Sequence, residues 1–175
     1  MSDASWRRAE LFAGLSPEEI DAVRPSFDEV GLAAGRDVIV EGEPGDDMFL
    51  LVSGRVRVRK SMVLKGVAVP ALAAEAGGKT LAELSDAQSP FFGEMALLDR
   101  DIRSASVTCL TDCRFLRIDR DRFFAFLAAR PEIGVRLVTV LAKRLAKVVR
   151  KNNTEIVKLT TALALVLSRR GQGRG

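Results

Sequence analysis

The chain has no histidine and only two cysteines among its 175 residues. It therefore lacks the usual general base and the commonest side-chain ligand of haem and metal ions. Cys109 and Cys113 do not form a C-x-x-C pair, and two thiols cannot complete a zinc site. We also recognise no nucleophile paired with a base. The sequence predicts no enzyme, no bound metal and no haem, with both cysteines as reduced, partly buried thiols.

Long apolar segments are absent as well. No run reaches the roughly 18 apolar residues that a membrane span needs, and residues 1–8 lack the apolar core of a signal peptide. The hydrophobic share of 47% and the charged share of 29% are typical of a globular protein in water. These features predict a cytoplasmic protein with no membrane span.

Positive charge is unevenly distributed along the chain, whose formal net charge is +4. Much of the excess lies in the C-terminal part, in Lys143, Arg144, Lys147, Arg150, Lys151, Lys158, Arg169, Arg170 and Arg174. Such a basic segment could touch nucleic acid or an anionic lipid surface. The alternative, which we favour, is a solvated helix face.

Residues 92–107 carry the most informative pattern. Gly93 and Glu94 begin a short apolar helical turn, and Arg103 opens the strand that we expect next. Free backbone N–H groups at the helix start and the guanidinium of Arg103 could hold a small anion between them. Because Glu94 would repel that anion, we expect it to accept hydrogen bonds from a hydroxyl, as a ribose would supply. An anion and a hydroxyl donor in one small pocket suggest a cyclic nucleotide.

This segment resembles the phosphate-binding cassette of the cyclic-nucleotide-binding domain family. That family includes catabolite-activator-like regulators, cyclic-nucleotide-dependent kinases and gated channels. Residues 35–58 are similar to the glycine-punctuated β-roll that precedes the cassette, and the resemblance covers most of residues 10–150. It implies an α+β fold, in which an antiparallel β-roll (jelly-roll) is flanked by an N-terminal helical arm and a long C-terminal helix.

The resemblance also implies a ligand site built from the cassette. Its expected members are Gly93, Glu94, Met95, Ala96, Arg103, Ser104 and Ala105. Arg103 would bind the cyclic phosphate, and Glu94 would accept a hydrogen bond from the ribose 2′-hydroxyl. Backbone N–H groups at positions 104 and 105 would also face the phosphate.

Two of these roles have alternatives that stay open. Arg103 could be a surface arginine paired with Asp99 or Asp101. Glu94 could be a carboxylate that is favoured at a helix start by the helix dipole. We expect Phe92 to pack in the core rather than to touch the ligand.

The identity of the nucleotide base has two alternatives. The Ser104 hydroxyl could reach the amino group of a guanine, yet bacterial cAMP receptors also carry serine at this place. We expect cAMP rather than cGMP. The base needs a lid, and the candidates on the long helix are Val148, Val149 and Asn152.

The chain divides into three predicted parts. Residues 1–131 form the β-roll with its flanking helices, residues 132–168 form a lid and dimerisation helix, and residues 169–175 form a flexible basic tail. An apolar insert at 61–78 replaces the short hairpin that the family has. Ser16 and Glu19 predict a capped helix within a helical arm at 5–25, and Asp119 predicts another helix start. The expected strands are 37–40, 48–52, 55–59, 80–84, 104–108 and 114–118.

Apolar residues recur at seven-residue spacing along the long helix. One series comprises Val138, Leu145, Asn152, Leu159 and Val166. Because a solitary apolar stripe is unfavourable in water, we expect a homodimer through a parallel coiled coil, with Asn152 fixing the register.

These expectations combine into a stand-alone cyclic-nucleotide receptor, a catabolite-activator-like sensor domain without the DNA-binding winged helix. Ligand would change helix or dimer geometry and so regulate an unknown protein partner. Two alternatives of other classes remain. One is a degenerate, ligand-free scaffold that uses the insert at 61–78 as a protein interface. The other is a truncated transcription regulator that binds nucleic acid through its basic helix, although we do not expect DNA as a partner.

Overall fold

The computed structural model describes the backbone of residues 3–61 and 78–172 and the side chains of residues 6–61 and 78–168. Most of the insert predicted at 61–78 lies outside the described residues, as does the end of the predicted tail. The chain forms two compact units, Met1–Leu137 and Val138–Gly175.

Short helical segments form the N-terminal arm: α1 (Asp3–Arg8), η1 (Glu10–Phe12), α2 (Pro17–Val23) and η2 (Arg24–Ser26). Ser16 caps α2 as predicted. Its hydroxyl accepts from the Glu19 N–H at 3.3 Å, and the Glu19 carboxylate accepts from the Ser16 N–H at 2.8 Å. The rings of Trp6, Phe12 and Phe27 have centroids 5.2–5.7 Å apart, so the arm has an aromatic centre of its own.

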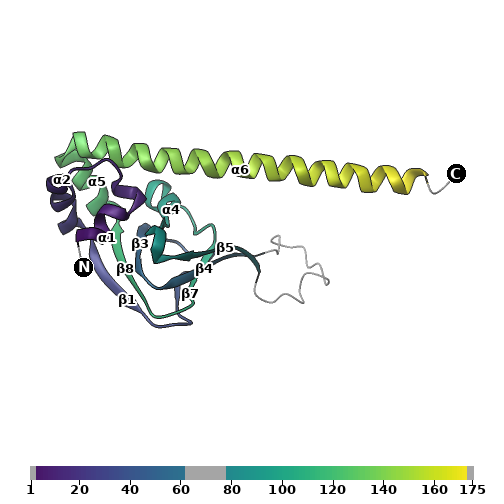
Figure 1. Ribbon diagram of the computed structural model, residues 1–175. Coiled ribbons are helices and arrows are strands. Elements are labelled where there is room, and N and C mark those ends of the chain that lie inside the picture. The colour runs from purple at the N-terminus through teal and green to yellow at the C-terminus, as the bar shows by residue number, and fades with distance from the viewer. Residues whose placement is uncertain (1–2, 62–77, 173–175) are drawn as a thin grey trace. The chain divides into compact units, whose positions relative to one another are not determined.

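The described strands form two four-stranded antiparallel sheets (Figure 1). The first sheet has the order β1 (Asp28–Leu32), β8 (Cys113–Asp119), β3 (Asp47–Ser53) and β6 (Phe91–Phe92). The second has the order β2 (Asp37–Ile39), β7 (Ser106–Cys109), β4 (Arg55–Lys60) and β5 (Lys79–Ser85). This arrangement, with helices before it and a long helix after it, confirms the predicted fold class.

The core of the β-roll draws side chains from both sheets, because each strand directs alternate residues inward. In β7, Val107 and Cys109 are buried whereas Ser106 and Thr108 are half-buried. Ring centroids 6.0–6.1 Å apart join the aromatic residues of this core, Phe49, Phe92 and Phe115. The prediction that Phe92 packs in the core is confirmed.

Two strand predictions needed correction next to the cassette. No strand was predicted between residues 84 and 104, but Phe91 begins β6, which pairs with Leu50 and Phe49 of β3. A strand of two residues is too short to show an alternating pattern. β7 begins at Ser106 rather than at residue 104, because the Arg103 backbone hydrogen-bonds instead to the loop at 42–43.

Three described helices follow in the second half of the chain: α4 (Glu94–Asp99), α5 (Arg120–Ala129) and α6 (Pro131–Gln172). Asp119 caps α5 as predicted, accepting from the Arg122 N–H at 2.9 Å. α6 ends at Gln172 rather than at Ser168, so the first part of the predicted tail is helical. The first glycine after Ser168 is Gly171, and no helix breaker stops the helix earlier.

The two cysteines are free and buried, in agreement with the expectation of reduced thiols. Burial, together with the neighbouring Cys113, raises the pKa of Cys109 to about 12. Among the described helices, none combines the length and the apolar character required to cross a bilayer.

Candidate functional site

β6 leads directly into α4, and the join requires a glycine. Gly93 has a φ of +89°, a conformation that residues with a Cβ rarely adopt. A Cβ here would lie 2.8 Å from the carbonyl oxygen of Asp47 and 3.0 Å from a guanidinium nitrogen of Arg103. Glycine thus brings the start of α4 close to Arg103.

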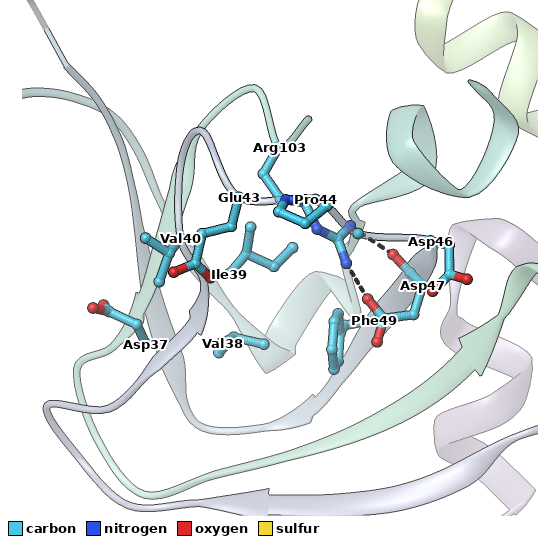
Figure 2. A pocket seen from close by; sticks show the side chains of 11 residues that line it. Asp37, Val38, Ile39, Val40, Glu43, Pro44, Asp46, Asp47, Phe49 and Arg103 are labelled. Atoms are coloured by element: carbon cyan, nitrogen blue, oxygen red, sulfur yellow. Dashed lines mark hydrogen bonds and ion pairs between the residues drawn. The ribbon is translucent and has the colours of Figure 1, made fainter. Parts of the chain in front are cut away.

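Arg103 is a buried arginine held by both its backbone and its side chain, of which 7% is exposed. Its N–H donates to the carbonyl of Glu43 at 2.8 Å, and its carbonyl accepts from Gly42 at 3.0 Å. The guanidinium forms an ion pair with the Asp47 carboxylate and donates to the Asp47 carbonyl at 2.7 Å. Figure 2 shows the Arg103 side chain directed at Asp47, with both contacts marked.

Asp47 joins two arginines. One carboxylate oxygen pairs with Arg103, and the other accepts from Arg117 Nε at 2.5 Å. Hydrogen bonding to Asp47 raises the pKa of Arg117 above its ordinary value. The Asp47 side chain is only 13% exposed, and the two cations offset the cost of burying its charge.

Gly45 provides space for the Arg103 guanidinium. A Cβ at this position would lie 2.5 Å from Cζ of Arg103 and 2.6 Å from a terminal nitrogen. From sequence alone, a glycine at 45 or 54 can serve either a positive φ or close approach of other groups to the backbone. Gly54 has a φ of +102°, whereas Gly45 is not among the residues with positive φ, so its role is room for the arginine.

Asp47 was missed as the partner of Arg103. The alternative that paired a surface Arg103 with Asp99 or Asp101 is wrong, because Arg103 is buried and its ion pair is with Asp47. The two residues are 56 positions apart, and no local spacing rule connects them. The available signal was a carboxylate at the start of an apolar strand.

A cavity of about 760 Å³ adjoins the cassette. Small-molecule sites span about 300–1,000 Å³. Three of the predicted site residues line the cavity: Met95, Arg103 and Ser104. Its charged lining residues are Arg59, Lys60, Arg103, Glu41, Asp99 and Asp101. Such a mixed lining suits a ligand that carries both an anionic group and hydrogen-bond donors.

The other predicted cassette residues are not among the described residues that line this cavity. Gly93 lies against Arg103, as noted above. Glu94 and Ala96 are buried, with 8% and 2% exposed, and Ala105 is half-buried. Their ligand roles stay predictions.

The predicted base lid lies on α6, in the second compact unit. Val148 and Val149 are 40% and 56% exposed, and Asn152 is exposed too. That these residues cap the base stays a prediction.

Sequence reasoning missed the contribution of β4. Lys60 Nζ donates to the Ser104 carbonyl at 2.6 Å and lies 3.4 Å from a carboxylate oxygen of Glu41. Arg59 donates to the Thr108 hydroxyl at 3.1 Å, while its buried Nε has no hydrogen-bond partner within the described chain. The alternation of basic and apolar residues in β4 predicts only that one face of the strand is solvated.

Arg103 also lines a second cavity of about 350 Å³, shown in Figure 2. Four carboxylates line it as well: those of Asp37, Glu43, Asp46 and Asp47. An excess of negative charge is unsuited to an anion, so we assign the candidate anion site to the larger cavity. In the described parts of the chain, no cluster of three or more acidic or cysteine side chains could hold a metal ion.

Comparisons with known proteins place this chain among relatives. The family model described as "Cyclic nucleotide-binding domain" matches residues 29–130. A "CRP-like cAMP-activated global transcriptional regulator" of Mycobacterium tuberculosis is 32% identical over 157 residues, which are 90% of this chain and 62% of that protein. The chain thus spans less than two thirds of the length of this relative.

Solved structures show the same fold. The Thermus thermophilus catabolite activator protein matches with a TM-score of 0.69 and 30% identity, covering 87% of this chain and 63% of that one. The N-terminal domain of a transcriptional regulator from Streptomyces coelicolor A3(2) matches with a TM-score of 0.66 and 30% identity, covering 82% and 94%. Since the family model covers more than half of the chain and the β-roll and its cassette are in place, the chain belongs to the cyclic nucleotide-binding domain family.

Proposed function

We propose that this chain is a receptor for a cyclic nucleotide, cAMP rather than cGMP, and not an enzyme. The observation that carries the proposal is a buried arginine, Arg103, beside a cavity of about 760 Å³. The cAMP-activated relative named above supports the choice of base. The cavity would take the cyclic phosphate at Arg103 and the ribose near the start of α4.

Arg103 has donors to spare for a phosphate. A guanidinium carries five N–H donors, and the contacts to Asp47 and Gly93 use at most three. A cyclic phosphate could therefore be bound while Asp47 keeps the guanidinium in place. Such a charge-assisted contact, sheltered from water, contributes about 1.5–3 kcal/mol.

Other polar groups of the cavity fit the rest of such a ligand. The buried Nε of Arg59, which has no partner within the described chain, is a donor for a ligand acceptor. The carboxylates of Glu41, Asp99 and Asp101 are acceptors for ribose hydroxyls or for an exocyclic amino group.

Regulation is the second part of the proposal. Ligand binding would shift the population of helix or dimer geometries and so change affinity for a protein partner. The exposed apolar residues of α6, among them Ile156, Leu159 and Leu163 at 58–69% exposure, favour a homodimer through this helix. We place this receptor in the cytoplasm, as its composition suggests.

Calorimetric titration of cAMP and then cGMP into the purified protein tests the proposal. Arg103→Ala should lower affinity by about tenfold or more. Arg57→Ala is the matched control, because Arg57 lies on β4 and pairs with Glu83 outside the cavity. Since Arg117 still pairs with Asp47 in the Arg103 variant, that variant should remain folded, which circular dichroism checks. Undiminished binding by a folded Arg103→Ala protein would contradict the proposal, as would no binding to ligand-free parent protein.

A further inference from the structure

Lys60, the last residue of β4, reaches across to the cassette. Its Nζ donates to the carbonyl oxygen of Ser104 at 2.6 Å. Ser104 and Ala105 lie between Arg103 and the first residue of β7. No strand includes them, so the sheet ladder does not determine the orientation of their peptide groups.

The hydrogen bond from Lys60 to the Ser104 carbonyl determines the direction of the Ala105 N–H group. The Ser104 carbonyl and the Ala105 N–H belong to the same peptide unit, and the described chain contains no cis peptide bond. In a trans peptide unit the C=O and N–H bonds point in opposite directions. A lysine that holds the Ser104 carbonyl on one side therefore directs the Ala105 N–H to the other side. The positive charge also polarises the peptide, which makes its N–H a stronger donor.

Lys60 is itself held in place. Glu41 lies 3.4 Å from Lys60 Nζ, and its second carboxylate oxygen accepts from the Ser61 N–H at 2.6 Å. The Glu41 N–H in turn donates to the Ser106 hydroxyl at 2.9 Å. These contacts join the loop at 41, the end of β4 and the start of β7 around the two cassette residues.

We propose that Lys60 is a positioning residue of the phosphate site, acting through the peptide between Ser104 and Ala105. This inference rests on the proposed function, and on the expectation from the family resemblance that the Ala105 N–H faces the cyclic phosphate. Lys60 orients and polarises that donor from the opposite side, and Glu41 keeps the lysine in place. The side chain of Lys60 is half exposed, so solvent screening limits the size of the effect.

Lys60→Met tests the role, because methionine keeps much of the side-chain length and removes the charge and the donor. We expect cAMP affinity to fall about three- to tenfold. The amide resonance of Ala105 should also move in nitrogen-15 correlation spectra recorded without ligand. Lys60→Arg, which keeps a cationic donor, should restore affinity to within about twofold and return the Ala105 resonance toward its parent position.

Lys79→Met is the matched control. Lys79 is an exposed lysine on β5 that pairs in register with Lys60. The same charge is removed from the neighbouring strand, so the control measures the long-range electrostatic effect alone. We expect it to change neither the affinity nor the Ala105 resonance appreciably.

Three results would overturn the proposal. Lys60→Met could bind cAMP as the parent does, it could lose affinity equally with Lys79→Met, or it could lose affinity with the Ala105 resonance unchanged. The last result would mean that Lys60 contacts the ligand directly. Absence of binding by the parent protein would instead contradict the proposed function. The ligand-free Ala105 spectra would still decide whether Lys60 orients this peptide.

Discussion

At the scale of single residues, the candidate site depends on how a buried arginine is kept in one position. Arg103 is paired with Asp47, which is shared with Arg117. Removing one partner of a buried ion pair leaves a charge that is poorly compensated, which is strongly destabilising. The second arginine on Asp47 should reduce that penalty when Arg103 is substituted. Gly45 and Gly93 complete the arrangement by leaving space around the guanidinium.

Gly45→Ala is predicted to weaken ligand binding while the β-roll stays folded. Its Cβ would lie 2.5 Å from Cζ of Arg103, so the guanidinium must move away from its place beside Asp47. We expect cAMP affinity to fall about tenfold, the effect of losing one charge-assisted contact. Titration calorimetry measures it. Gly31→Ala is the control, since a Cβ at Gly31 meets nothing within 4 Å. Equal affinities for the two variants would show that Gly45 is not needed for space.

Asp119 makes the free energy of unfolding depend on pH in the acid range. Hydrogen bonds from the Arg122 N–H and side chain hold the pKa of Asp119 below its ordinary 3.8. A lowered folded pKa means that this stabilisation is complete above the unfolded value and is lost as the pH falls through the folded value. Asp119→Asn keeps a capping side chain but loses the charge. Its stability should therefore be lower near neutral pH, and the difference from the parent should shrink on acidification. Urea unfolding between about pH 7 and about pH 3 measures this, and a constant difference would contradict it.

At the scale of elements, the cassette helix is tied to the next helix by one side chain. The Arg120 guanidinium donates to the Leu97 carbonyl at 2.6 Å and to the Leu98 carbonyl. Its backbone N–H donates to the carbonyl oxygen of Asp46 at 2.8 Å, and its Cζ lies 4.4 Å from the ring centroid of Phe124. Carbonyls in the last turn of a helix lack intrahelical partners and favour cations. Arg120 therefore links the end of α4, the loop before β3 and the first turn of α5.

Arg120→Ala is expected to lower the free energy of unfolding by about 1–2 kcal/mol, since two carbonyls lose a charged donor. Hydrogen exchange in the last turn of α4 should become faster, because that turn is no longer held. Chemical denaturation measures the free energy of unfolding, and mass spectrometry measures hydrogen exchange in α4. Arg114→Ala is the control, because the exposed Arg114 side chain lies on β8 and donates to the Ser53 hydroxyl at 3.2 Å. If exchange in α4 is the same in both variants, Arg120 does not stabilise this helix end.

At the scale of the whole molecule, α6 carries an apolar stripe that the single chain leaves exposed. Leu159, Leu163 and Val166 are 69%, 58% and 53% exposed. Burying an exposed aliphatic side chain contributes about 1.5–3 kcal/mol of favourable free energy. Packing against a second helix would supply that burial. A homodimer is thus favoured by the exposed area as well as by the heptad spacing.

Substituting both Leu159 and Leu163 with lysine is predicted to convert the proposed homodimer into a monomer. The two charges would lie in the proposed seam, where they could neither pair nor be hydrated. Analytical ultracentrifugation measures the mass. Lys151→Gln, at an exposed position of the same helix, should remain dimeric. A parent protein that sediments as a monomer would contradict the dimer.

The sequence by itself determined the fold class, most of the strands and helices, and the cassette with Arg103. These features are encoded locally: strands alternate, Ser16 and Asp119 cap helices, and the glycines mark turns. The tertiary structure decided which distant groups meet. Asp47 forms an ion pair with Arg103, which is 56 positions away in the sequence. Lys60 donates a hydrogen bond to the Ser104 carbonyl, which is 44 positions away. Periodicity along one strand cannot predict such pairs, because they depend on the registers of several strands and the space left by glycine at 45 and 93.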